Sequence, residues 1–199
     1  MFTGIVESVG KVRGTSRTGS NMHIYIESTF LDEVYIDQSI AHNGVCLTVD
    51  EILEDRYRVT AIDETLKKSN LGGLSEGKTV NLERCLKMNG RIDGHMVQGH
   101  VDTTTTCLDI QNENGSWLYT FKMPSDGFKL VVDKGSICIN GVSLTVVDPT
   151  SETFKVAIIP YTYEHTTFAN LTIGDKINIE YDIIGKYVLK HVGAFAQMG

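Results

Sequence analysis

The sequence predicts an all-β protein that consists of two tandem copies of one small antiparallel barrel, followed by a C-terminal helix. Three observations lead to this prediction. Most of the chain forms an internal repeat, and apolar and polar side chains alternate with a period of two within each copy. Only the last stretch shows the three- and four-residue apolar spacing that is typical of a helix.

The repeat aligns residues 36–83 with residues 133–180 at a constant offset of 97, with 15 identities in 48 positions and no gap. A second offset, 95, aligns Gly4-Ile5-Val6 with Gly99-His100-Val101, so we expect each copy to begin with a G-x-V strand. A gapless alignment of this length is not expected by chance, and the chain is therefore interpreted as a duplication. Later identical pairs are Thr65 and Thr162, Gly77 and Gly174, Asn81 and Asn178, and Glu83 and Glu180.

Each copy contains an Asn-Gly pair, Asn43-Gly44 and Asn140-Gly141, which suits a two-residue hairpin turn because both positions tolerate positive φ. Branched apolar residues at every second position after each turn predict a strand with one face in a core. Further strands are expected at 23–28, 56–62, 79–84, 117–122, 153–159 and 176–182, and turn- or helix-like segments at 64–72 and 161–169. Short strands at this spacing indicate a small barrel in each half.

The last stretch lies outside the repeat and predicts an amphipathic helix of about three turns. Its apolar stripe is compatible both with an oligomer contact and with packing onto its own barrel, and we adopt the oligomer contact. The stripe comprises Ile184, Tyr187, Val188, His191, Val192 and Phe195. The expected domains are a first barrel at 1–94, a second barrel at 95–184 and a helix at 185–199.

Composition narrows the class of protein. The formal charge of −7, with basic residues scattered apart from Lys67-Lys68, argues against nucleic acid and against a membrane-surface patch. No apolar run of about 18 residues and no signal-peptide pattern is present, so we expect a cytoplasmic protein. The four cysteines form no CxxC pair, and no metal-spaced His/Cys set or nucleotide-binding glycine loop occurs. We therefore expect no metal and no bound cofactor.

The strands after the two Asn-Gly turns carry the first candidate site. Their polar faces present Cys46 and Thr48 in the first copy and Ser143 and Thr145 in the second. Small thiol and hydroxyl groups beside a glycine turn leave space and hydrogen-bonding groups for a ligand. For one copy alone a solvated strand face is the favoured explanation, and a buried small hydrophobe is the ordinary role of a cysteine. Because the polar face recurs in both copies, a ligand site and a solvated face explain it about equally well.

His100 is the second candidate, because it occupies the position that Ile5 holds in the first copy. Histidine is the side chain whose unperturbed pKa lies near neutrality, so His100 is a candidate proton carrier. His95 lies five residues earlier, which on a strand places it on the opposite face, and we do not expect the two to act as a pair. The other histidines, His23, His42, His165 and His191, are interpreted as structural.

Four motifs together resemble the riboflavin synthase family of the α-chain type, over essentially the whole chain. They are Met1-Phe2-Thr3-Gly4-Ile5-Val6-Glu7, Asn43-Gly44-Val45-Cys46-Leu47-Thr48-Val49, Gly94-His95-Met96-Val97-Gln98-Gly99-His100-Val101 and Asn140-Gly141-Val142-Ser143-Leu144-Thr145-Val146. The resemblance implies two six-stranded Greek-key barrels and a C-terminal helix that assembles a homotrimer. It implies transfer of a four-carbon unit between two molecules of 6,7-dimethyl-8-ribityllumazine, giving riboflavin and 5-amino-6-ribitylaminouracil without cofactor or metal.

The resemblance also implies one lumazine in each barrel, with the first barrel of one subunit facing the second barrel of its neighbour. His100, Cys46, Ser143 and Thr145 are the implied catalytic residues; Cys46 is compatible with adding to C7 of the ring as a thiolate or with an uncharged binding role. The alternative is a non-catalytic antenna protein that binds lumazine or flavin. The implied binding residues are Gly4, Ile5, Val6, Ser39, Cys46, Leu47, Thr48, Ala61, Ile62, Asp63, Glu64, Thr65, Gly99, His100, Val101, Lys134 (opposite Asp37 in the repeat), Ser143, Leu144, Thr145, Ile158, Ile159, Pro160, Tyr161 and Thr162.

Overall fold

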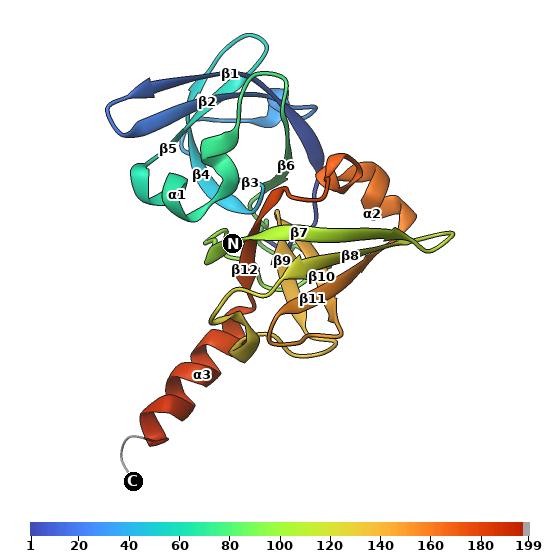
Figure 1. Ribbon diagram of the computed structural model, residues 1–199. Helices are drawn as coiled ribbons and strands as arrows, with labels where there is room; N and C mark the ends of the chain where they lie inside the picture. The colour runs from blue at the N-terminus through green and yellow to red at the C-terminus, as the bar shows by residue number, and fades with distance from the viewer. Residues whose placement is uncertain (197–199) are drawn as a thin grey trace.

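The computed structural model contains two closed antiparallel barrels of six strands each, and a C-terminal helix that projects from the second barrel (Figure 1). It describes residues 1–196; residues 197–199 of the predicted 185–199 segment, and the side chains from 193 onward, including that of Phe195, lie outside the description. The first barrel comprises β1 (Ser8–Thr18), β2 (Asn21–Glu27), β3 (Ser39–His42), β4 (Val45–Ile52), β5 (Tyr57–Ala61) and β6 (Thr79–Arg84). The second comprises β7 (Thr103–Asn112), β8 (Trp117–Lys122), β9 (Ser136–Ile139), β10 (Val142–Val147), β11 (Thr153–Ile158) and β12 (Lys176–Tyr181).

The two barrels share one topology. Neighbouring strands follow the order β1-β2-β5-β4-β3-β6 in the first barrel, and the second barrel has the same order with each number raised by six. Strands β3, β4 and β5 are joined consecutively and β6 returns beside β3, which is the Greek-key arrangement. The predicted duplication and the all-β fold class are confirmed.

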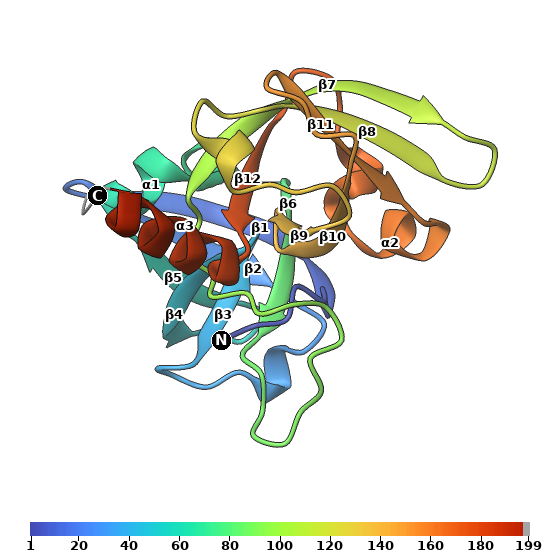
Figure 2. The same cartoon turned by 90° about the horizontal axis from the view of Figure 1, so that it is seen from below.

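Helices occupy the segments that the sequence marks as turn- or helix-like. Helix α1 (Asp63–Lys68) and α2 (Pro160–His165) stand at equivalent places in the two halves, and α3 (Ile183–Ala196) follows the second barrel. In Figure 2, which views the molecule from below, α3 lies in front of the barrels, on the side toward the viewer. Four short 3-10 turns complete the chain: η1 (Leu31–Glu33), η2 (Asn70–Gly73), η3 (Gly127–Lys129) and η4 (Thr167–Asn170).

Each barrel closes around its own apolar core, which is filled by the apolar side chains of the predicted alternating pattern. On β4 the side chains of Val45, Leu47 and Val49 are buried in the first core, while Cys46 is half-buried and Thr48 is exposed. Both Asn-Gly pairs form the expected turns, with φ of 47° and 79° in each copy. These positive values explain why asparagine and glycine stand there.

The two Asn-Gly turns meet at the contact between the barrels. Asn81 Nδ2 donates to the Asn140 carbonyl and Asn178 Nδ2 donates to the Asn43 carbonyl, both at 2.8 Å, so equivalent residues make the same bond in opposite directions. These four asparagines are buried. Because buried amides are costly to leave unpaired, this exchange fixes how the barrels sit on one another.

The G-x-V segments differ from the prediction. Neither Gly4–Val6 nor Gly99–Val101 belongs to a strand; the first strands of the two barrels begin at Ser8 and Thr103. Gly4 and Gly99 have φ of 76° and 80°, which turns the chain out of the extended conformation. Each segment instead crosses to the other half, where Ser143 N–H donates to the Gly4 carbonyl at 2.7 Å and Cys46 N–H donates to the Gly99 carbonyl at 2.9 Å.

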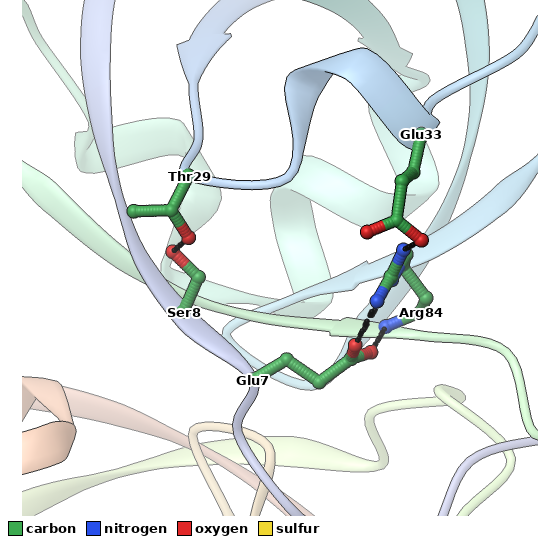
Figure 3. Close-up of polar contacts among 5 residues, drawn as sticks. All are labelled: Glu7, Ser8, Thr29, Glu33 and Arg84. Carbon is green, nitrogen blue, oxygen red and sulfur yellow. Dashed lines mark hydrogen bonds and ion pairs between the residues drawn. The ribbon is translucent and has the colours of Figure 1, made fainter.

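An ion-pair cluster anchors the chain where the first crossing segment enters β1 (Figure 3). Arg84, the last residue of β6, pairs with Glu7 at 2.6 Å and with Glu33 at 2.8 Å. Its guanidinium also lies 4.7 Å from the centre of the Phe30 ring. Arg84 Nε and Nη2 both donate to Glu7 Oε2, and the main-chain N–H of Arg84 donates to Glu7 Oε1, which ties the end of the crossing segment to the first barrel.

The first barrel holds a buried polar pair that the second lacks. His42 Nε2 lies 2.8 Å from the Tyr57 hydroxyl, whereas the equivalent residues in the second copy are Ile139 and Phe154. Burial lowers the pKa of His42 from 6.5 to about 4. A histidine with a depressed pKa binds its proton first in the unfolded state, so stability is lost progressively as pH falls from the unfolded pKa of 6.5 toward the folded pKa of about 4. We expect this histidine to cost about 2 kcal/mol of unfolding free energy between pH 7 and pH 5.

Urea unfolding at these two pH values tests this expectation. In the double variant His42→Ile/Tyr57→Phe, which copies the pair of the second barrel, the pH-dependent loss is expected to shrink by about 2 kcal/mol. A variant that loses as much stability as the wild type between pH 7 and pH 5 would show that His42 is not the titrating group.

Candidate active site

A cavity of about 230 Å³ opens on the first barrel and joins residues from both halves of the chain. Strand β4, helix α1 and the crossing segment 99–101 line it. Six of its nine lining residues belong to the predicted site: Cys46, Glu64, Thr65, Gly99, His100 and Val101. The cavity therefore brings the predicted thiol and the predicted proton carrier together, although they lie in different copies of the repeat.

Close packing of the crossing segment on β4 sets the position of Cys46 relative to His100. A Cβ atom on Gly99 would lie 2.6 Å from Cys46 Cβ, so only glycine permits this approach. Val101 packs against the first core, and His100, which lies between Gly99 and Val101, is exposed. The imidazole is thus open to solvent, as a group that exchanges protons with water needs to be.

Three residues that line the cavity were not predicted: Val45, the first residue of β4, Lys68, the last residue of α1, and Ser69, which follows it. Lys68 is one helical turn from Glu64 and pairs with it at 3.2 Å. Lys68 and Ser69 could have been found from the sequence, because they follow Glu64 and Thr65 by four residues and residues four apart share a helix face.

The second half pairs a histidine with Ser143, the equivalent of Cys46. His95 Nδ1 lies 2.7 Å from Ser143 Oγ. Burial lowers the pKa of His95 and so favours its neutral form, while Asp182 opposes the shift. A neutral imidazole can accept the proton of a serine hydroxyl or orient it. This partnership was missed, because the opposite-face argument for His95 and His100 assumed a strand, whereas residues 95–101 belong to no strand of either barrel.

The first crossing segment completes this second site. Besides the bond from Ser143 to the Gly4 carbonyl, a Cβ atom on Gly4 would lie 2.7 Å from Ser143 Cβ. Val6 packs against the second core, and Ile5, which lies between Gly4 and Val6, is 44% exposed. Ile5 and His100 thus hold equivalent places at the two sites.

The remaining predicted residues of the first half surround β4 and α1. Thr48 is exposed and pairs in register with Ser39 on β3. Leu47 and Ala61 direct their side chains into the core. Ile62 is exposed just before α1, and Asp63 pairs with Lys67 at 2.5 Å.

The remaining predicted residues of the second half lie on β10, β11, α2 and one turn. Thr145 is exposed, Leu144 packs partly against the core and Ile158 is buried within it. Ile159 is exposed just before α2; Pro160 begins this helix, and the carbonyl of Thr162 accepts from Thr166 Oγ1 at 2.7 Å. Tyr161 stacks on His165 with ring centres 4.1 Å apart, and Lys134 has a φ of 63° in the turn before β9, like Asp37 in the first copy at 69°.

Among residues 1–196, no group of three or more His, Cys, Asp or Glu side chains is arranged to hold a metal ion. Within the same residues, no helix has the length and apolar character needed to cross a membrane.

Two closed six-stranded barrels of one topology, with equivalent sites on β4 and β10, define a duplicated antiparallel barrel protein. The family model described as "Lumazine binding domain" matches the chain twice, at residues 3–85 and 98–182. Riboflavin synthase of Bacillus subtilis (strain 168) is 41% identical over 96% of this chain and 89% of its own length. Riboflavin synthase of Mycobacterium bovis is 39% identical over 94% of this chain and 96% of its own length. The chain belongs to the riboflavin synthase family.

Solved structures share the fold at lower identity. The structure described as LumP complexed with riboflavin superposes with a TM-score of 0.85 at 23% identity, covering 91% of this chain and 99% of that one. LumP complexed with 6,7-dimethyl-8-(1'-D-ribityl) lumazine superposes with a TM-score of 0.83 at 24% identity, covering 90% and 98%. At this identity the likeness concerns the fold.

Proposed function

We propose that this protein is a riboflavin synthase, which converts two molecules of 6,7-dimethyl-8-ribityllumazine into riboflavin and 5-amino-6-ribitylaminouracil. The observation that carries the proposal is the pair of unequal sites. One joins Cys46 and His100, whereas the other joins Ser143, the equivalent of Cys46, with His95 and has Ile5 in the place of His100. Two copies of one compound with different roles need two similar pockets with different polar groups. Family membership supports the same activity, and we place it in the cytoplasm.

The chemistry requires positioning and proton transfer rather than a cofactor. The 7-methyl protons of a lumazine are acidic because the ring delocalises the resulting anion. Two carbon–nitrogen bonds of the donor ring break, and its four-carbon unit forms two carbon–carbon bonds to the methyl carbons of the acceptor. Both products come from one compound, so no outside oxidant is consumed. In this scheme His100 moves protons, while Cys46, Ser143 and Thr145 orient the rings or deliver a nucleophile.

The experiment that tests the activity is incubation of the purified protein with dimethylribityllumazine while riboflavin absorbance is followed. We expect riboflavin to accumulate. Tight binding of the lumazine without any riboflavin would instead identify an antenna protein.

We further propose a homotrimer in which the first barrel of one subunit faces the second barrel of its neighbour. Helix α3 projects from the barrel in Figure 1 and leaves Ile184, Tyr187, Val188 and Val192 exposed. A mainly apolar groove of about 480 Å³ lies between α3 and the turn at 129–136. An exposed apolar stripe beside an apolar groove is typical of a surface that another subunit covers.

Removal of residues 185–199 is expected to yield monomers that still bind lumazine but form riboflavin slowly, because each reaction would need barrels from two subunits. Light scattering after gel filtration measures the mass. Val188→Glu is expected to do the same, whereas Lys190→Glu on the same helix is the matched control and should leave the mass unchanged. A truncated protein that remained trimeric would rule out this role for α3.

A further inference from the structure

Two buried glutamates hold the crossing segments, and neither belongs to the predicted site. Glu83 on β6 and Glu180 on β12 are identical residues at equivalent places in the repeat. Their exposed fractions are 6% and 2%. A carboxylate is seldom buried this deeply unless several donors compensate for the lost water.

The donors of Glu180 are main-chain groups of the segment that carries His100. Gln98 N–H donates to one carboxylate oxygen at 2.6 Å, and His100 N–H donates to the other at 2.8 Å. The carboxylate therefore spans the turn at Gly99, whose own carbonyl accepts from Cys46 N–H. A single side chain thus fixes the backbone of His100 relative to the β4 strand that carries Cys46.

Glu83 clamps the other crossing segment in a similar way. It accepts from Thr3 N–H at 2.7 Å, from Thr3 Oγ1 at 3.1 Å and from Gly4 N–H at 3.0 Å, whereas the second donor to Glu180 is His100, the equivalent of Ile5. The segment that Glu180 clamps presents an imidazole, and the segment that Glu83 clamps presents the aliphatic side chain of Ile5. The chain therefore contains its own comparison for a glutamate that clamps a segment without an imidazole.

The clamps depend on the acceptor character of the carboxyl group. Burial raises the pKa of Glu180, and the N–H groups of Gln98 and His100 counteract that shift. An ionised carboxylate only accepts hydrogen bonds, whereas a glutamine amide would turn two hydrogens toward one of the N–H donors. Glu180→Gln thus keeps the volume of the side chain and breaks one arm of the clamp.

We propose that Glu180 is a positioning residue for proton transfer at the first site, where its carboxylate sets the place of His100 beside Cys46. This inference rests on the proposed function. Glu180 does not line the cavity and acts only through the segment 98–100. Displacement of a reacting group by about 1 Å is enough to slow a reaction strongly while the ligand still binds.

Steady-state kinetics of riboflavin formation test the proposal. Glu180→Gln is expected to lower kcat by at least about tenfold with KM within about twofold. In a His100→Ala background the same change is expected to lower kcat by less than about twofold, because the group that it positions is gone. Glu83→Gln is the comparison, because Glu83 holds the segment beside Ser143 and not the one that carries His100. Any loss of kcat that it causes is expected to be the same with and without His100. Urea unfolding verifies that each variant is folded.

Glu180→Asp, which keeps the charge but has a shorter reach, is the second variant if Glu180→Gln does not fold, and the same dependence on His100 is expected. An equal loss of kcat from Glu180→Gln with and without His100 would overturn the positioning role while the wild type still forms riboflavin. A wild type that forms no riboflavin would overturn the proposed function, and this inference with it.

Discussion

Replacement of His100 by alanine is expected to lower the rate of riboflavin formation by about 100- to 10,000-fold, while the affinity for lumazine changes little. The imidazole is exposed at the rim of the cavity that Cys46 lines, where it can exchange protons with solvent and with a bound ring. Its removal is therefore expected to act on proton transfer rather than on binding.

Steady-state kinetics give the rate, and a titration that follows lumazine fluorescence gives the affinity. His23→Ala is the control, because His23 lies on β2 and bonds to Thr18 and Thr60, away from the cavity. An unchanged rate in His100→Ala would rule out the proton role. A large loss of affinity at an unchanged maximal rate would assign His100 to binding.

Gly44→Ala is expected to destabilise the protein by at least about 3 kcal/mol. Gly44 has a φ of 79°, and a Cβ atom there would lie 2.8 Å from the Gly141 nitrogen of the facing turn. Backbone cannot move aside as the end of a flexible side chain can, so the two barrels would have to separate. This separation would also break the asparagine bonds of the contact.

Gly77→Ala separates the backbone strain of a positive φ from the close approach of the two barrels. Gly77 has a similar φ, 87°, but a Cβ atom there meets nothing within 4 Å, so only the backbone strain of about 1–2 kcal/mol is expected. Urea unfolding of both variants at one protein concentration gives the comparison. Equal losses for Gly44→Ala and Gly77→Ala would show that the close approach of the barrels does not contribute.

The fold was largely predictable because the duplication provides two independent patterns for each element. The segment 56–62 became β5 at Tyr57–Ala61, and 153–159 became β11 at Thr153–Ile158. The segments 64–72 and 161–169 contain the helices α1 and α2 with their 3-10 turns. Local alternation and turn residues determine such elements, and these signals are present in the sequence itself.

The candidate site was less predictable, because it depends on which half each crossing segment contacts. The alignment shows that Ile5 and His100 are equivalent, but not that His100 lies in the cavity of the first barrel. That placement follows from the turns at Gly4 and Gly99 and from the clamps of Glu83 and Glu180. These are long-range contacts, and neither periodicity nor propensity encodes them.

The measurement that tests the central proposal most directly is the product balance of the reaction at completion. The purified protein is incubated with dimethylribityllumazine in buffer that contains a chelator and no added cofactor, and all three compounds are quantified by chromatography. If two pockets of one assembly react their ligands with each other, two lumazines disappear for each riboflavin and each aminouracil formed. One riboflavin per lumazine, or riboflavin only after a cofactor is added, would contradict this.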